Sequence, residues 1–276
     1  ACGAMLLCGT VLWQRGEPPL ARFDYRPREA AGLIRCTYTL IPFSPQEGDP
    51  SRYLKPPGSR LAVRDGSGPR FILGTDPIGQ DVLSQMLHAC RLAISIGLVS
   101  TGIAVSIGIT IGAVAGYCGG WVDAVLQRCI ETFMAIPVLF LLIVTAGLLP
   151  PGMRSTYATM AVIGAVSWTG AARFTRAEFY RLRGQDFVLA ARAAGLPLRS
   201  ILFRHMLPSG VTPVLVDASF SIAAAILAEA TLSFLGLGPI DQPSWGKLLA
   251  GATGSTGEFV WWLAAFPGGA IFVTVL

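Results

Sequence analysis

The stretch LAISIGLVSTGIAVSIGITIGAVAG, residues 92–116, carries no charged side chain and decides the class of the whole chain. A helix needs about 20 mostly apolar residues to cross the hydrocarbon core of a bilayer, and this stretch is longer than that. The composition agrees, because 53% of the 276 residues are hydrophobic, 13% are charged and the mean hydropathy is +0.58. Such values are far from those of soluble domains, so the sequence predicts a polytopic membrane protein.

Four more stretches come near the length of a membrane span or reach it. They are residues 130–149, 156–174, 211–235 and 259–276, and we expect Pro137 and Pro267 to kink two of them. Residues 1–13 are apolar but short, and they lack the basic start and the cleavage site of a signal peptide, so we interpret them as part of a first span. The sequence therefore predicts an all-α integral membrane protein with six transmembrane helices, of which the first and the last are truncated.

The segment between the fourth and fifth spans is the most basic of the short loops. Its arginines are Arg173, Arg176, Arg181, Arg183, Arg192, Arg199 and Arg204. Short loops rich in Lys and Arg stay in the cytoplasm, whereas long polar loops escape this rule. We therefore place residues 175–210 and both chain ends in the cytoplasm and residues 14–91 outside the cell, with residues 92–276 forming the transmembrane domain.

The outer segment, residues 14–91, is too short and too rich in proline for an independent enzyme domain. Within VRDGSGPRFIL, Asp65-Gly66 lies between two short apolar runs, which predicts a small β-hairpin in an otherwise irregular loop. Further on, Asp76 is predicted to cap an amphipathic helix that begins at Pro77 and lies on the membrane surface before the second span.

Several classes of site are not expected in this chain. The cysteines form no CxxC pair and the only histidines are His88 and His205, so no metal-binding spacing occurs. Cys36 and Cys90 fall in the outer segment, where a disulfide can form, although small buried thiols are our preferred interpretation. No GxxxxGK[ST] motif is present, so we expect no ATP, other cofactor or metal on this chain. The net charge of +5 resides in loops, which disfavours nucleic acid as a partner.

The segment AARAAGLPLRSILFRHMLP, residues 190–208, predicts a helix, a sharp corner and a second helix. Residues 186–194 favour helix, and Gly195 suits a left-handed residue at the helix end. Pro197 is expected to start the second helix, and Pro208 is expected to end it.

One face of the first of these helices is narrow and mostly methyl-sized. By helical spacing it contains Phe187, Ala190, Ala191 and Ala194. Such a face allows a partner to approach closely, but the residues alone fit two interpretations equally. It packs either on another protein or on the spans of this chain.

The same segment resembles the cytoplasmic coupling loop of bacterial ABC importer permeases. That pattern is Glu-Ala-Ala, three residues, Gly, nine residues, Ile, one residue, Leu-Pro. The residues that match it are Ala190, Ala191, Gly195, Leu207 and Pro208, whereas Leu189 replaces the Glu and His205 the Ile. Three more segments resemble the dipeptide/oligopeptide/nickel subgroup, and in particular its second, C-type dipeptide permease. They are LGTDPIGQDVLSQML, AGYCGGWVDAVLQR and ILAEATLSFLGLGPIDQPSWGKLL.

This resemblance implies a multi-pass subunit of the bacterial plasma membrane with the type I ABC importer fold. It implies a heterodimer with a related permease, a peptide delivered by an extracytoplasmic substrate-binding protein, and two cytoplasmic subunits that bind ATP and magnesium. This chain would then be no enzyme. The residues expected to couple it to the ATPases are Phe187, Ala190, Ala191, Ala194, Gly195, Leu198, Leu207 and Pro208.

Glu229 is the one acid well inside a predicted span. Acids within the membrane usually face the bundle or a cavity, so Glu229, Phe234 and Trp245 are candidates for the translocation path. A purely structural hydrogen bond is the other interpretation of Glu229. Residues 238–245, GPIDQPSW, are expected to leave the helix and dip back toward the pore mouth, because Gly, Pro and Trp suit irregular backbone at the interface.

Two alternative functions remain open for the residues alone. An ion-driven secondary transporter is the first, although neither internal repeats nor a central acidic pair is present. A permease of the same family that carries nickel or haem is the second. An intramembrane serine protease is excluded by location, since His88 and His205 are both expected outside the membrane core.

Overall fold

The computed structural model describes residues 43–61, 70–240, 242–253 and 259–276. Residues 43–59 and 70–276 belong to one compact unit. The helices of this unit, in chain order, are η1 (Pro50–Arg52), α3 (Val82–Cys118), α4 (Gly120–Ala135), α5 (Val138–Leu148), η2 (Pro151–Met153), α6 (Thr156–Val166), α7 (Thr169–Leu182), α8 (Asp186–Ala193), α9 (Leu198–Ser200), the π-helical turn η3 (Ile201–Met206), α10 (Leu207–Gly210), α11 (Thr212–Phe234), α12 (Trp245–Gly251) and α13 (Trp261–Val275).

The predicted all-helical class is confirmed. In the described ranges, β-pairing is limited to two isolated bridges, Thr75 with Asp81 and Thr253 with Phe259. The predicted hairpin turn at Asp65-Gly66 and the predicted first span at residues 1–13 lie outside the described residues.

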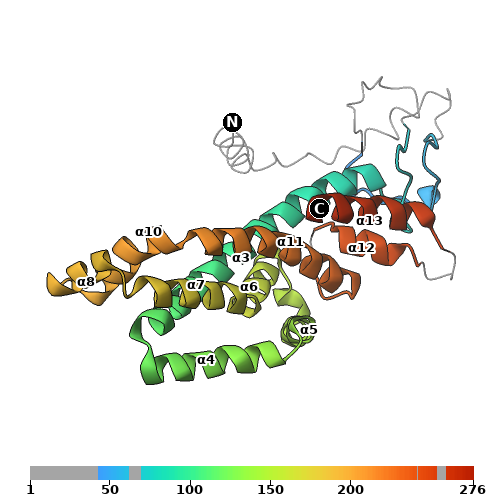
Figure 1. The fold of residues 1–276 in the computed structure, drawn as a ribbon. Coiled ribbons are helices and arrows are strands. Elements are labelled where there is room, and N and C mark those ends of the chain that lie inside the picture. Colours follow the sequence, from blue (N-terminus) through green and yellow to red (C-terminus); the bar gives the residue numbers. More distant parts are fainter. Residues whose placement is uncertain (1–42, 62–69, 241, 254–258) are drawn as a thin grey trace. The chain divides into compact units, whose positions relative to one another are not determined.

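Helix α3 is the element around which the others are arranged. It has 37 residues and is therefore about 55 Å long at 1.5 Å per residue, well beyond the roughly 30 Å of a hydrocarbon core. Figure 1 shows it crossing this unit, with α7 and α8 toward one end and α12 and α13 toward the other. These two groups of helices are thus connected by one continuous helix.

The prediction for the start of this helix is wrong. Asp81 is the N-cap, because its carboxylate accepts the Ser84 N–H at 2.8 Å and the helix begins at Val82. Asp76 instead closes a tight turn that contains Gly79 at φ +80°, a conformation that no α-helix contains. From Val82 the helix continues without a break into the predicted second span, so no separate interfacial helix precedes it.

The described residues contain fewer straight spans than the five that the sequence predicted for this part of the chain. Among the described residues, α3 and α11 are long and apolar enough to cross a membrane, and α4 with α5 adds a third if that pair, bent by 82°, is one span. The bend occurs at Pro137, as predicted, and Pro267 lies inside α13. The predicted span 156–174 is divided into α6 and α7, and α6 and α13 are shorter apolar helices.

Buried apolar side chains line α3 from one end to the other. Near its start, Val82 packs with Leu248 and Leu263 of α12 and α13. In its middle, Leu92 and Ile96 pack in a cluster with side chains of α5, α6 and α11. The cluster at its C-terminal end joins α7, α8 and η3. Each group of helices is therefore held in place against the same central helix.

Helices α3 and α7 approach each other closely because α3 presents glycines at four-residue spacing. A Cβ atom at Gly108 would lie 2.8 Å from the Trp168 carbonyl oxygen, and one at Gly116 would lie 3.0 Å from the Tyr180 nitrogen. At Gly112 it would overlap the Ala172 carbonyl oxygen. Within lipid, small residues of this kind allow helices to pack through their backbones.

We predict that Gly112→Ala destabilises the protein, because the added methyl group forces α3 and α7 apart. The expected loss is about 1–3 kcal/mol, as for other overpacked sites. The matched control is Gly102→Ala, since Gly102 lies in the same helix with nothing within 4 Å of a Cβ atom. There the higher helix propensity of Ala should leave stability equal or raise it. Thermal unfolding of the detergent-purified protein compares the two, and equal unfolding temperatures would contradict the packing.

Candidate functional site

The corner predicted at Gly195 is present. Gly195 has φ +69°, and two backbone hydrogen bonds close the end of α8 around it. The Gly195 N–H donates to the Arg192 carbonyl at 2.9 Å, and the Leu196 N–H donates to the Ala191 carbonyl at 3.2 Å. This pair of bonds is the Schellman motif, for which Gly is favoured because it lacks a Cβ atom. Nothing lies within 4 Å of a Cβ atom at Gly195, so backbone conformation is the constraint there and space is not.

The second helix differs from the prediction, because Pro208 does not end it. The chain runs from Pro197 through α9, the π-helical turn η3 and α10 as far as Gly210. In η3 the Leu207 N–H donates to the Leu202 carbonyl, five residues back. Pro208 then stands in α10 directly after the π-helical turn, so the helical backbone continues past the proline.

One side of α8 is buried in this chain. Val188 is completely buried and Ala191 is only 6% exposed. They pack with Phe179 and Leu182 of α7, Ala113 and Tyr117 of α3, and Ile201, Leu202 and Met206 of η3. The prediction that Ala191 belongs to a face for a partner is therefore wrong, since the three-residue step from Val188 puts it in the core of this chain.

The other side of α8 and the corner expose apolar side chains. Phe187 is 40% exposed, Leu189 is 48% exposed and Leu198 is 46% exposed. Of the remaining predicted coupling residues, the exposed ones are Ala190, Ala194, Gly195 and Pro208, while Leu207 is partly buried against the core cluster. Leu189, which stands where the coupling-loop pattern has Glu, extends this apolar surface. We call Phe187, Leu189, Ala190, Ala194 and Leu198 the outer face of α8.

Two arginines of the basic loop attach it to the end of α3 and the start of α4, and a third packs on a ring of α7. The Arg176 guanidinium donates two hydrogen bonds to the Asp123 carboxylate, and the one from Nη2 to Oδ2 is 2.7 Å long. The Arg183 guanidinium lies 3.9 Å from the centre of the Tyr180 ring. Arg192 Nε donates to the Tyr117 hydroxyl at 2.9 Å.

The sequence alone did not indicate the acceptors of these contacts. Tyr117 and Asp123 both lie in AGYCGGWVDAVLQR, and the only signal was that this segment resembles the family. The bends that bring them to the arginines come from Gly119 at φ +65° and Gly120 at φ +56°. A side chain at Gly119 would meet only the movable end of the Arg183 side chain, so the positive φ is what favours glycine at this corner.

Glu229 lies in the packed junction between α11 and α12. Its side chain is 1% exposed and its Oε1 accepts the Ser233 hydroxyl at 2.6 Å. Trp245, at the start of α12, is also buried and donates its indole N–H to the Met86 carbonyl at 3.2 Å. Phe234 is 43% exposed, so the three candidates for the path do not share one surface. The structural interpretation of Glu229 is thus favoured.

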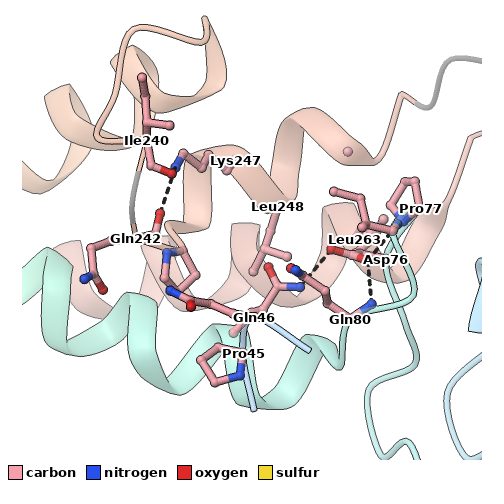
Figure 2. Close-up of a pocket in the computed structure, with 14 residues that line it drawn as sticks. Pro45, Gln46, Asp76, Pro77, Gln80, Ile240, Gln242, Lys247, Leu248 and Leu263 are labelled. Carbon is pink, nitrogen blue, oxygen red and sulfur yellow. Dashed lines mark hydrogen bonds between the residues drawn. The ribbon is translucent and has the colours of Figure 1, made fainter. Parts of the chain in front are cut away.

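The opposite end of α3 borders a cavity of about 520 Å³, which Figure 2 shows. Its wall is formed by parts of residues 45–46, 76–85 and 240–251 together with Leu263. Lys247 Nζ donates to the carbonyls of Ile240 and Gln242 at 3.1 and 2.8 Å, which folds this irregular segment back toward α12. The predicted departure from helix in residues 238–245 is confirmed up to Ser244, because α12 begins at Trp245.

Three cysteines lie within the described residues, and none of them forms a disulfide there. Cys90, Cys118 and Cys129 carry free thiols, and Cys90 is partly buried in α3. Cys36, the other member of the candidate disulfide, lies outside the described residues.

Comparisons with known proteins agree with this arrangement. Residues 108–276 match the family model described as binding-protein-dependent transport system inner membrane component. A putative peptide permease protein of Brucella suis is 36% identical over 245 residues, which are 87% of this chain and 76% of that protein. The di/tripeptide transport system permease protein DppC of Pseudomonas aeruginosa is 34% identical over 238 residues, 86% of this chain and 76% of that protein.

A solved structure of the MetNI methionine ABC transporter in an inward-facing conformation has a similar fold. The TM-score is 0.52, and the match covers 69% of this chain and 89% of that chain at 16% identity. At this identity the likeness concerns the fold alone. It agrees with the predicted class of a type I importer permease.

We predict that Glu229→Ala destabilises the protein whereas Glu229→Gln does not. The alanine leaves the buried Ser233 hydroxyl without its acceptor, at an expected cost of about 1–3 kcal/mol. Glutamine keeps an acceptor oxygen at the same position, so transport should also stay normal. Glu131→Ala is the control, because Glu131 pairs with Arg128 on an exposed surface and its loss should leave the unfolding temperature unchanged. Normal stability with lost transport in Glu229→Gln would favour a role of the charge in the path.

Proposed function

Because the chain belongs to the family of binding-protein-dependent transport system inner membrane components, we propose that it forms one half of a peptide translocation path coupled to ATPases through α8. It is a multi-pass permease subunit of an ABC importer. The other half of the path is a related permease, and two cytoplasmic subunits hydrolyse ATP. An extracytoplasmic binding protein delivers the peptide.

The observation that carries the proposal is the exposed outer face of α8. Phe187, Leu189 and Leu198 are each between 40% and 48% exposed, although the helix beneath them is packed on a buried cluster. Arg183, Arg192 and Arg199 lie in the same stretch of sequence, and charged guanidinium groups keep such a segment out of the hydrocarbon core. Lipid therefore does not cover these apolar side chains, and a protein groove is the occupant that matches them.

The ATPase subunits are the protein partner that fits this surface best. The face combines three large apolar side chains with two alanines, which lose no side-chain entropy on burial, and it adjoins the Gly195 corner. The chain also carries no GxxxxGK[ST] phosphate-binding motif. ATP and magnesium are therefore bound by partner subunits, and the free energy of ATP hydrolysis has to reach this chain through a contact with them. A contact at α8 supplies the mechanical connection.

Peptide is the proposed substrate because relatives that are 34–36% identical over most of the chain are named as peptide or di/tripeptide permeases. The same subgroup pattern extends to nickel and haem permeases, which are the alternative. Identification of the ligand on the binding protein that co-purifies with the complex distinguishes these substrates. A metal or haem ligand would replace peptide in the proposal while leaving the coupling role of α8 intact.

We predict that residues near the cavity in Figure 2 are reached from outside the cell and that the corner after α8 is reached from inside. In a cysteine-free background, Ile240→Cys and Gln242→Cys should react with a membrane-impermeant maleimide in intact cells. Both residues are exposed, as is Arg199 outside the outer face of α8, but Arg199→Cys should react only after permeabilisation. The reverse pattern would overturn the topology and place the outer face of α8 away from any cytoplasmic ATPase.

The second prediction concerns Gly195. In Gly195→Val a β-branched residue has to adopt φ +69°, which costs about 1–2 kcal/mol and favours another corner geometry. We expect the variant to insert and to pair with the related permease, but to lose peptide uptake and to release the ATPases in a pull-down.

Gly184→Val is the matched control for this test. Gly184 lies in the same loop, is exposed, has open space around a Cβ atom and has no positive φ. It should retain both the ATPases and uptake, as should the conservative change Arg199→Lys. If Gly195→Val also kept both, α8 would be an ordinary loop helix and the proposed coupling role would fail.

A further inference from the structure

The contact between Arg192 and Tyr117 joins α8 to the central helix α3. Arg192 Nε lies 2.9 Å from the Tyr117 hydroxyl, and the guanidinium carbon lies 4.8 Å from the centre of the ring. Tyr117 is 8% exposed in the last turn of α3. The arginine thus combines a charge-assisted hydrogen bond with a contact to the ring, although it is on an otherwise exposed stretch of α8.

Arg192 takes part in the corner as well. Its carbonyl accepts the Gly195 N–H of the Schellman motif, while its side chain reaches α3. One residue therefore connects the geometry of the corner with the position of the central helix. The other contacts below α8 are apolar and have no preferred direction, so they allow sliding that a hydrogen bond does not.

Helix α3 connects this contact with the cavity at its N-terminal end. The helix runs without interruption from Val82 to Cys118, and at its outer end Gln85 donates to Asp76 in the wall of the cavity. The glycine packing against α7 keeps the two helices together as one body. A displacement at either end of α3 is therefore carried to the other end.

We propose that Arg192 and Tyr117 are a positioning pair that fixes α8 to α3, so that movement of α3 and movement at the ATPase contact occur together. The inference rests on the proposed coupling role of α8 and adds to it the residues that transmit the movement. Their effect is on the stimulation of ATP hydrolysis and not on the affinity of the ATPases.

The test uses the complete transporter, with both permeases, both ATPases and the binding protein, in lipid vesicles. The variants are Tyr117→Phe, which keeps the ring and removes the hydroxyl, Arg192→Gln, which removes the charge, and the two combined. We expect unchanged ATPase retention and unchanged basal ATP hydrolysis. Stimulation by the peptide-loaded binding protein should fall roughly tenfold, the effect of losing one hydrogen bond to a charged group.

The combined variant should be no worse than either single one, because both remove the same contact. Arg192→Lys, which can still donate to the hydroxyl, should restore part of the stimulation. Arg199→Gln is the control, since Arg199 is exposed in the same loop and forms no hydrogen bond or ion pair with the described residues. It should behave as the unmodified protein.

Three results would overturn the pair: full stimulation in both single variants, multiplicative losses in the combined variant, or loss of stimulation only in proportion to lost ATPase. Gly195→Val, measured alongside, separates the two proposals. If it releases the ATPases while the pair variants behave as the unmodified protein, the positioning role alone is wrong. If Gly195→Val retains the ATPases and normal uptake, the coupling role of α8 is wrong, and the positioning role that rests on it is wrong as well.

Discussion

The backbone contact between α3 and α7 at Gly108, Gly112 and Gly116 is the interaction on which the rest of the structure depends. Apolar helices gain little from the hydrophobic effect when lipid is the alternative environment, so close packing has to hold them together. Because a Cβ atom at these positions would meet the backbone of α7, the two helices form one rigid pair. Helix α7 is followed by the basic loop and α8, so its packing places them at the C-terminal end of α3. Their position relative to the N-terminal end of α3 is then fixed.

The arginines of the basic loop serve two physical purposes. Their number predicts the cytoplasmic side of the membrane, and that prediction needs no knowledge of contacts. In the folded chain, Arg176 and Arg192 also attach the loop to α4 and α3, through Asp123 and Tyr117. A loop that is fastened in this way can present the outer face of α8 as a rigid surface. This is what a contact needs if it is to transmit movement and not only to bind.

Features with a local cause could be predicted from the sequence. The corner at Gly195, the break at Pro137 and the irregular backbone before Trp245 each follow from the conformational limits of one or two residue types. The choice between Asp76 and Asp81 as the helix cap could not be made in the same way. It depended on the turn at Gly79, which both carboxylates flank.

Features with a distant cause were missed. Ala191 has the size and spacing of a partner-facing residue, but its burial depends on where α7 and η3 lie. The partners of Arg176 and Arg192 are 53 and 75 residues earlier in the chain, beyond the reach of any periodicity. Glu229 could be identified as an acid in a span, but its structural role depends on the hydrogen bond from Ser233 within a packed junction. The π-helical turn that carries the chain past Pro208 had no signal in composition or spacing.

The most direct measurement of the central claim is photocrosslinking from Phe187 in native membranes that contain the whole transporter. A photoreactive phenylalanine analogue at Phe187, on the outer face of α8, is compared with the same analogue at Phe220, which is 73% exposed on α11. The ATPase subunit should be captured from Phe187 and not from Phe220. Capture of the ATPase from neither position, or from Phe220 alone, would contradict the assignment of α8 as the coupling surface.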